Sequence, residues 1–498
     1  MQLLLRNKFL LIFCLTGIVL YTIMSMPFTF WGDEFWSIRY ASKGLPAFIN
    51  EYIVNPDNHP PLYYLLLNIW QKLAGISFKN DWLFRLPGII FHFSTIMFIA
   101  TKFIKKRQKK IWFIILASVS SYFFMYAHMV RYYTMAAFFY VVSFYLILKW
   151  IKDNSIKSFL LLNISAIILG YIDYPSYLFF NFIIVIFFSV YKKGSLVSKL
   201  SSFTKYLLIQ AIAMIPVFYL NWVYFISNGT STIGQIQPSI FSNLLKTLMG
   251  VGFVPYQILI GEFFLVKNFP VIAVFLIITA SIATFLLVKK VKTILLLSQL
   301  LIFTVLNIFV ASFFLTIAIG RYPVFSYARF LLPTAYFILL ILVEIFYKKP
   351  KYILIIILLV NCLTISKNIQ LKDFINPIYF IPKNKIVNTA VFLKEQYPHA
   401  KIYSPEIFSV EGYELAKHFS ITNNIINPGV YILFRPMRLK KTKNDLINYI
   451  NKIESEKKLK LLQVIGFDNI NTETKAFLQK NKLMTIPYKY YFFVFLKE

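Results

Sequence analysis

Apolar segments long enough to cross a membrane recur along this chain, and clusters of basic residues separate them. A transmembrane helix needs about 20 mostly apolar residues, and about eleven segments meet that criterion. They are residues 8–26, 82–101, 111–129, 132–150, 158–173, 174–191, 206–226, 269–288, 293–316, 330–347 and 352–366. Only 14% of the 498 residues are charged, whereas a soluble domain carries about 25%. The sequence therefore predicts a polytopic α-helical membrane protein.

The basic residues predict how the chain is oriented. A formal net charge of +32 would suggest nucleic-acid binding in a soluble protein, but in a membrane protein such an excess is typical of cytoplasmic loops. Basic clusters recur in alternate loops, at residues 105–110, 149–157, 192–193, 289–290 and 348–351. We therefore expect a multi-pass protein of the plasma (inner) membrane with a cytoplasmic N-terminus. After an odd number of spans, its C-terminus lies outside.

Several outer parts of the chain are not predicted to span the membrane. Residues 27–81 are too polar, but the apolar and aromatic stretch at 61–74 predicts an amphipathic interfacial helix, and residues 227–268 look similar. From residue 367 polar residues dominate. Strand patterns at 401–403, 461–465 and 490–496 alternate there with helical patterns such as 411–419. We expect a transmembrane domain at 1–366 and a small outer α/β domain at 367–498.

In this topology acidic residues, arginines and a histidine gather on the outer face. They are Asp33, Glu34, Asp57, His59, Asp81, Arg85, Arg131, Asp173, Arg321 and Arg329. Ionisable groups at a membrane are costly and are usually functional. Arginine has a planar fork that holds a phosphate in two places, which the lysine ammonium cannot do. The pattern predicts an outer pocket for an anionic, lipid-linked substrate.

The candidate catalytic residues are Asp33 and Glu34, in a Trp-Gly-Asp-Glu quartet at residues 31–34 directly after the first span. Carboxylates at such a place are suited to acid–base chemistry. The alternative is a solvated loop pair near the lipid headgroups, with the neighbouring aromatic residues as ordinary interfacial anchors. We favour the catalytic interpretation because aromatic residues flank the acidic pair.

Three candidate ligands for donor or acceptor lie in or beside an Asn-His-Pro-Pro-Leu-Tyr-Tyr motif at residues 58–64. They are Asp57, His59 and Tyr63. His59 is suited to hydrogen bonding with a sugar or a phosphate. The alternative is that the His-Pro-Pro sequence only marks a rigid turn before a helix, because proline suits the first helical turn.

Further candidate ligands lie at the edges of other spans. They are Arg85, Arg131, Tyr132, Asp173, Arg321 and Arg329. Arg131 is the charge in a tight outer turn and is a candidate phosphate ligand. Arg85 either contacts the donor or extends to lipid headgroups, and Asp173 is either a ligand or a hydrated turn residue. One of the last two arginines is expected to meet the phosphate, and the sequence does not say which.

Several catalytic motifs are missing from the sequence. There is no glycine-rich phosphate loop and no His/Cys cluster at metal-ligand spacing, so a nucleotide-dependent enzyme is disfavoured. Both cysteines, Cys14 and Cys362, lie inside apolar runs, which is typical of neither a metal site nor a disulfide framework. We expect no cofactor and no metal ligands, although a divalent cation between a carboxylate and a phosphate would be compatible with the chemistry.

Four motifs together resemble the GT-C membrane glycosyltransferases. They are Asp-Glu at 33–34, Asn-His-Pro-Pro-Leu-Tyr-Tyr at 58–64, Arg-Leu-Pro at 85–87 and Arg-Tyr-Tyr at 131–133. The resemblance is in particular to the bacterial branch related to protein O-mannosyltransferases and lipid A aminoarabinose transferases (glycosyltransferase family 39-like). It covers the chain to about residue 366, with the best motifs in the first 140 residues.

This resemblance implies an inverting transfer of a sugar from a polyprenyl-phosphate donor to an acceptor hydroxyl on the outer face. Asp33 would be the general base, and Glu34 would orient it or hold the acceptor. The implied partners are a polyprenyl-phosphate-linked sugar, membrane lipids and a lipid, glycan or protein acceptor.

Two other classes remain open at this stage. A transporter or polymerase of lipid-linked saccharides would also show many spans and outer arginines, but it should place charges at mid-membrane near broken helices. Here the main intramembrane acid, Glu344, lies near the cytoplasmic end of its span. A non-catalytic binder of lipid-linked sugar would keep the arginines without needing Asp33.

The alternating basic clusters generate a topological prediction. Cysteines introduced near Gly234 and at Ser404 should react with an impermeant thiol reagent in intact cells, whereas a cysteine near Gln108 should not. Labelling near Gln108 but not at Ser404 would reverse the orientation and move the proposed site to the wrong side of the membrane.

Overall fold

The chain forms two compact units, which a computed structural model describes for most of their residues. The described residues are 8–30, 32–54, 56, 59–77, 80–191, 195–228, 295–319, 331–347, 352–370, 381–403, 419, 421–422, 428–434, 454–456, 458–465 and 492–497. The helical unit comprises Met1–Ser25 with Tyr40–Pro377, and the sheet unit comprises Met26–Arg39 with Ile378–Glu498. Segments far apart in the sequence therefore contribute to each unit.

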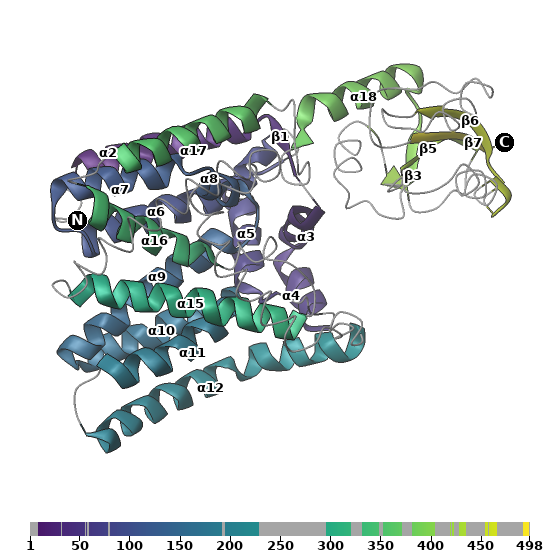
Figure 1. Cartoon of the computed structure of the whole chain (residues 1–498). Helices are drawn as coiled ribbons and strands as arrows, with labels where there is room; N and C mark the ends of the chain where they lie inside the picture. The colour runs from purple at the N-terminus through teal and green to yellow at the C-terminus, as the bar shows by residue number, and fades with distance from the viewer. Residues whose placement is uncertain are drawn as a thin grey trace. The chain divides into compact units, whose positions relative to one another are not determined.

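Apolar helices build the helical unit (Figure 1). They are α2 (Lys8–Ser25), α4 (Leu45–Val54), α5 (Leu62–Leu73), the 3₁₀ turn η1 (Asp81–Arg85), α6 (Leu86–Lys102), α7 (Arg107–Val119), α8 (Ser121–His128), α9 (Tyr133–Asp153), α10 (Ile156–Ile172), α11 (Tyr174–Tyr191), α12 (Leu196–Asn228), α15 (Leu295–Ile319), α16 (Leu332–Phe346) and α17 (Tyr352–Gln370). Every predicted span except 269–288, which lies outside the described residues, coincides with one or two of these helices.

The composition of these helices is that of a multi-pass membrane protein. Among the described residues, 4 helices are long and apolar enough to cross a membrane, and α7 with α8 forms a fifth if the bent pair counts as one span. Further helices, such as α10 and α16, are apolar but shorter. The prediction of about eleven spans and the prediction of their orientation both stay predictions.

Contacts at the helix ends show that α2 runs opposite to α6, and that α7 runs opposite to α16. Arg85 Nη1 donates a 2.9 Å hydrogen bond to the Ser25 carbonyl, which joins the end of α2 to the start of α6. At the other end, Lys109 near the start of α7 forms an ion pair with Glu344 near the end of α16. Glu344, the acid noted in the sequence, therefore has a basic partner.

The third predicted span is broken. Helices α7 and α8 meet at an angle of 59°, and Ser120 between them has an extended backbone. A break inside an apolar unit exposes backbone groups that need new partners. Asn361 of α17 accepts a 2.8 Å hydrogen bond from the Ser121 N–H through Oδ1, and the Tyr21 hydroxyl of α2 donates 2.7 Å to the Ser118 carbonyl. Side chains of two neighbouring helices thus provide hydrogen-bond partners for the Ser121 N–H and the Ser118 carbonyl.

The amphipathic helix predicted at residues 61–74 is present as α5, Leu62–Leu73, and its place at the membrane interface stays a prediction. It buries Tyr63, Tyr64, Leu67 and Asn68 on one face and exposes Leu73 on the other. Together with α4 it lies at the end of the bundle opposite the start of α2 (Figure 1). The amphipathic pattern was therefore sufficient to predict this helix.

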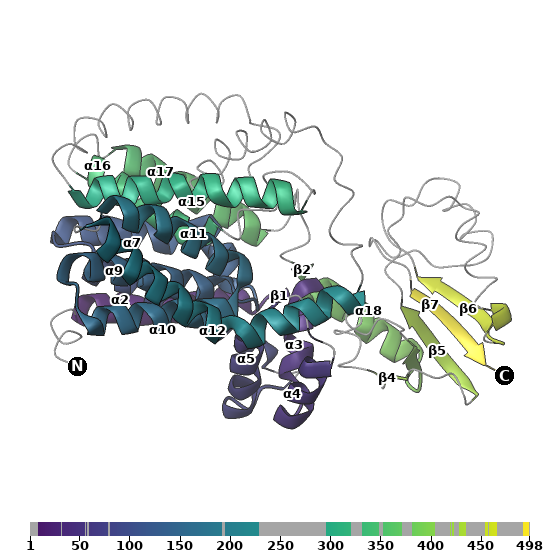
Figure 2. The same ribbon diagram turned by 90° about the horizontal axis from the view of Figure 1, so that it is seen from below.

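The sheet unit is an α/β unit. A short antiparallel pair joins β1 (Phe28–Thr29) to β2 (Ile381–Pro382). The main sheet has 5 strands in the order β4-β3-β5-β7-β6, seen in part in Figure 2. The unit's elements are α3 (Gly32–Ala41, continuing into the helical unit), α18 (Lys383–Gln396), β3 (Lys401–Tyr403), β4 (Ile421–Thr422), β5 (Gly429–Phe434), β6 (Lys460–Ile465) and β7 (Phe492–Lys497).

The main sheet is parallel on one side and antiparallel on the other. β3 pairs in parallel with β4 and β5, and β7 pairs antiparallel with β5 and β6. Its core packs Leu393 of α18 against Ile402, Ile432 and Val494 of the strands. The three strand patterns read from the sequence coincide with β3, β6 and β7, whereas the helical pattern at 411–419 lies almost entirely outside the described residues.

The predicted domain boundary at residue 366 stays a prediction beside the two compact units. Helix α17 continues to Gln370, and the second part of the sheet unit begins at Ile378. The β1–β2 pair also assigns Met26–Arg39 to the sheet unit. The acidic pair Asp33 and Glu34 therefore belongs to the same unit as the C-terminal sheet.

Candidate functional site

The acidic pair lies at the start of a short helix. Helix α3 begins at Gly32, directly after β1, so Asp33 and Glu34 lie in its first turn. The positive end of a helix dipole favours carboxylates at this position. Glu34 is buried, with 1% of its surface exposed, and Phe30 packs edge-on against Phe35 with ring centroids 6.0 Å apart. Glu34 is thus an enclosed acid and not a solvated loop residue.

The aromatic residues beside the acidic pair differ in exposure. Phe35 is buried, whereas Trp36 is 46% exposed. The Arg39 guanidinium lies 5.2 Å from the centre of the Trp36 ring. Trp31 lies outside the described residues. The exposed side of α3 therefore presents an aromatic ring with a cation over its face.

Arg131 and His59 meet in the helical unit. Arg131 Nη2 lies 2.7 Å from His59 Nε2, and Tyr132 packs against both, with its ring 5.0 Å from the imidazole and 5.4 Å from the guanidinium carbon. The guanidinium only donates hydrogen bonds, so His59 Nε2 must accept. His59 is therefore a neutral imidazole with its proton on Nδ1, and it brings no negative charge to Arg131.

The turn that carries Arg131 is enclosed by the protein. Met129, Val130, Arg131 and Tyr132 are all buried, with Arg131 3% exposed. The turn follows His128, whose ring nitrogens contact the carbonyls of Phe124 and, at 2.8 Å, Tyr21. A guanidinium in such surroundings acts through a lower effective dielectric than it would in water. Its attraction for an anion is correspondingly stronger.

Gly88 allows the first turn of α6 to approach this turn closely. A Cβ atom at residue 88 would lie 2.9 Å from the Ala127 carbonyl oxygen and 3.3 Å from the Met129 carbonyl oxygen. Both atoms belong to the backbone and cannot move aside as a side chain can. Glycine at this position therefore helps to set where the Arg131 turn lies.

The loop that carries His59 is held from α4. The Tyr52 hydroxyl donates a short hydrogen bond to the His59 carbonyl. Tyr52 belongs to an aromatic cluster with Tyr40, Phe48 and Tyr64, whose ring centroids lie 4.9 to 6.4 Å apart. The His-Pro-Pro turn does precede a helix, and it also presents His59 to Arg131. The two interpretations of this motif are therefore compatible.

Arg85 and Asp173 hold helix ends. Arg85 is 2% exposed and bonds to the carbonyl at the end of α2, so its guanidinium is enclosed and does not extend to the lipid headgroups. Asp173 is 1% exposed, and its Oδ2 accepts a 3.0 Å hydrogen bond from the Ser176 N–H. It therefore caps the start of α11, which is not the environment of a hydrated turn residue.

The remaining candidates are a buried tyrosine and residues that are not described. Tyr63 is 1% exposed on α5. Asp57, Arg321 and Arg329 lie outside the described residues, as do Gly234 and Ser404. Within the part of the chain that the structure describes, no three His, Cys, Asp or Glu side chains gather as a metal site.

Sequence reasoning missed polar residues that act on the backbone. Asn68 of α5 and Asn361 of α17 both hydrogen-bond to backbone groups of distant segments. For Asn68 the signal was available, because a polar residue on the apolar face of an amphipathic helix requires a buried partner. For Asn361 no local pattern indicated the partner.

Comparison with known proteins identifies the fold of the chain. No family model and no curated protein matches it. Among solved structures, ArnT from Cupriavidus metallidurans bound to undecaprenyl phosphate is similar with a TM-score of 0.51 and 10% identity, over 89% of this chain and 95% of that one. ArnT in the apo state has a TM-score of 0.41 and 11% identity, over 90% of this chain and 95% of that one. The first comparison shows that the chain has an ArnT-like fold, which confirms the predicted GT-C resemblance at the level of fold.

The close approach at Gly88 generates a stability prediction. Gly88→Ala should lower the free energy of unfolding by about 1–3 kcal/mol, the usual cost of overpacking, because backbone oxygens block the new methyl group. Gly170→Ala is the control, because its Cβ would mainly meet the flexible end of Met214. Thermal unfolding of both variants in detergent provides the measurement. Equal melting temperatures for Gly88→Ala and wild type would contradict the close approach.

Proposed function

We propose that the protein is an inverting glycosyltransferase that moves a sugar from a polyprenyl-phosphate donor to an acceptor hydroxyl on the outer face of the membrane. The Arg131–His59 pair carries this proposal. Its guanidinium is buried and lies 2.7 Å from His59 Nε2, and a guanidinium held in a fixed orientation is suited to grip a phosphate in two places. The likeness in fold to ArnT, whose structure contains undecaprenyl phosphate, supports a lipid phosphate as the donor.

The arginines would stabilise the leaving group. The bond between the anomeric carbon of the sugar and the phosphate oxygen breaks, so negative charge grows on the polyprenyl phosphate. A preorganised guanidinium in a water-poor site stabilises that charge in the transition state. Arg131 is assigned this role, with one of Arg321 and Arg329 as a second ligand. Asp57, His59, Tyr63 and Tyr132 would line the donor or acceptor site.

The acidic pair would activate the acceptor. As the acceptor oxygen bonds to the anomeric carbon, its proton passes to Asp33 as general base. Inversion requires only this one base, on the face opposite the leaving group, and no covalent intermediate. Glu34 would orient Asp33 or hold the acceptor. Arg85 and Asp173 would support the site by fixing the helix ends that they contact.

Asp33→Asn tests the catalytic role directly. Asparagine keeps the size of the side chain but cannot accept the proton, so transfer should fall by about 10²–10⁴-fold, the usual contribution of a general base. Binding of the lipid donor and insertion into the membrane should be unchanged. The assay follows sugar from a labelled polyprenyl-phosphate donor, with Glu34→Gln as the smaller-effect comparison.

The two carboxylates can exchange roles without loss of the proposal. An inactive Glu34→Gln protein beside an active Asp33→Asn protein would make Glu34 the base. Normal transfer by both variants would exclude acid–base catalysis by this pair. A transporter, a polymerase or a non-catalytic binder of lipid-linked saccharide would then explain the fold better.

Arg131→Lys tests phosphate binding. A lysine ammonium cannot reproduce the two-point grip of the guanidinium, so Arg131→Lys should weaken donor binding nearly as much as Arg131→Ala. Affinity for a labelled polyprenyl-phosphate sugar is the measurement. Lys109→Met is the control. It removes a cation that pairs with Glu344, where α7 begins and α16 ends, and it should leave donor affinity unchanged. Full binding by Arg131→Ala would remove Arg131 from the site.

A further inference from the structure

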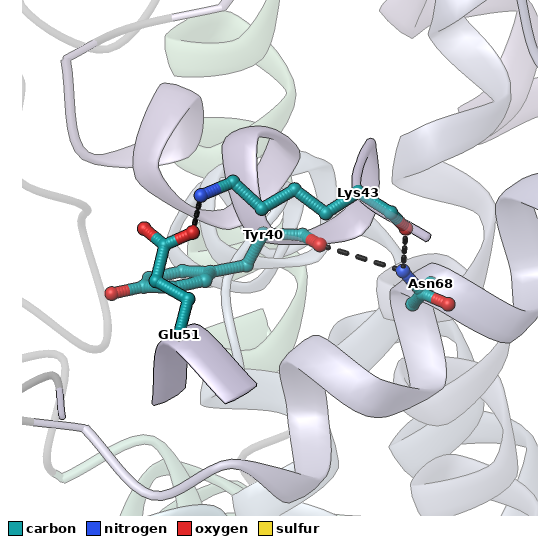
Figure 3. Close-up of polar contacts among 4 residues, drawn as sticks. All are labelled: Tyr40, Lys43, Glu51 and Asn68. Carbon is teal, nitrogen blue, oxygen red and sulfur yellow. Dashed lines mark hydrogen bonds and ion pairs between the residues drawn. The ribbon is translucent and has the colours of Figure 1, made fainter. Parts of the chain in front are cut away.

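Asn68 joins helix α5 to the end of α3 (Figure 3). It is fully buried, with 0% of its surface exposed. Its Nδ2 lies 3.0 Å from the Ala41 carbonyl oxygen, 2.5 Å from that of Lys43 and 3.5 Å from that of Tyr40. Carbonyl oxygens only accept hydrogen bonds, so the atom that faces them is the amide nitrogen. Asn68 is therefore a donor to the end of α3.

These contacts meet a need of the helix. The last four carbonyls of an α-helix have no partner within the helix, and α3 ends at Ala41. Many helices solve this with a glycine that turns the chain back, whereas here a side chain from another helix supplies the donor. Asn68 Oδ1 has no hydrogen-bond partner among the described residues. The amide thus acts through its N–H groups.

Neighbouring contacts hold the same helix end. Lys43 forms an ion pair with Glu51 of α4, as Figure 3 shows. The Tyr40 ring packs on Tyr64 of α5 with centroids 4.9 Å apart. Tyr64 and Asn68 are four residues apart on α5 and therefore lie on one helix face. The end of α3 is consequently fixed by polar and aromatic contacts from α4 and α5.

Helix α3 transmits this constraint to its first turn. It has 10 residues, which corresponds to about 15 Å at 1.5 Å per residue. A helix this short behaves as one stiff element, so a contact at its last turn bears on the residues of its first turn. Asp33 and Glu34 lie at the opposite end of the same element.

We propose that Asn68 is a positioning residue that sets the catalytic acids by anchoring the end of α3. This inference rests on the proposed function, because it assigns to Asn68 a role in aligning the general base. A misplacement of about 1 Å can lower a rate about 10²-fold. Loss of the anchor should therefore reduce turnover more than substrate affinity.

Substitutions at residue 68 separate the hydrogen bonds that the Asn68 amide donates from the volume that its side chain fills. Asn68→Leu keeps the volume and removes the donor. Asn68→Asp keeps the shape but places carboxylate oxygens against carbonyl oxygens at the negative end of the helix dipole. We expect kcat to fall about 10–10²-fold for Asn68→Leu and further for Asn68→Asp, with donor affinity within about threefold of wild type.

Asn163→Leu is the matched control. Asn163 is also a buried asparagine, 2% exposed, and it bonds to the Phe159 carbonyl and to Gln210 within the helical bundle. Its removal should have a comparable cost in stability without reaching α3. We expect kcat for this variant to stay within about threefold of wild type.

A second readout follows α3 itself. Trp36 is exposed on α3, so a nitroxide label on Trp36→Cys, in a Cys14→Ala, Cys362→Ser background, reports the mobility of the helix. Asn68→Leu should raise the mobility of the label, and Asn163→Leu should not. This measurement needs no substrate, so it tests the anchor even if the wild-type protein transfers no sugar.

The outcomes distinguish the two proposals. A low kcat together with a mobile label supports the positioning role. Unchanged label mobility, or a mobile label with normal kcat, would overturn it while the transferase proposal stands. A wild-type protein without transfer activity, in which Asn68→Leu still loosens the label, would contradict the transferase and the catalytic use of the anchor but keep the anchor as a structural contact.

Discussion

Backbone groups inside an apolar unit have no water to bond to, and this constraint shapes the site. An unsatisfied group in such surroundings costs several kcal/mol. At the break between α7 and α8, Asn361 and Tyr21 supply such bonds to the backbone at Ser121 and Ser118. The bend redirects α8, which ends at His128, just before the turn that carries Arg131. The position of the Arg131 guanidinium thus depends on the break between α7 and α8 and on the hydrogen bonds made there.

Side chains also bond to the backbone at three other buried helix ends. Arg85 bonds to the carbonyl at the end of α2, Asp173 caps the start of α11, and Asn68 caps the end of α3. In each of these contacts a buried polar side chain hydrogen-bonds to a backbone group at a helix end and so stabilises the fold. Arg131 differs, because its contact is with the side chain of His59. This contact between two side chains joins two of the motifs that were selected from the sequence.

The sequence predicted what depends on local pattern and missed what depends on distant partners. Apolar length was sufficient for the helices of the bundle, and amphipathic spacing was sufficient for α5. Nothing near Phe28 indicates that it pairs with Pro382, a residue more than three hundred positions away. The bend at Ser120 was equally unreadable, because serine is common in unbroken membrane helices. The break depends on Asn361, which a local pattern cannot show.

The candidate site was also predictable in part from local sequence and in part only from contacts between distant residues. The motif residues Arg131 and His59 were selected from local sequence, and the structure brings them within 2.7 Å. That the imidazole is neutral follows only from the contact itself, because a guanidinium requires an acceptor. An acceptor at this place orients the guanidinium, and a guanidinium of fixed orientation is suited to hold a phosphate in two places.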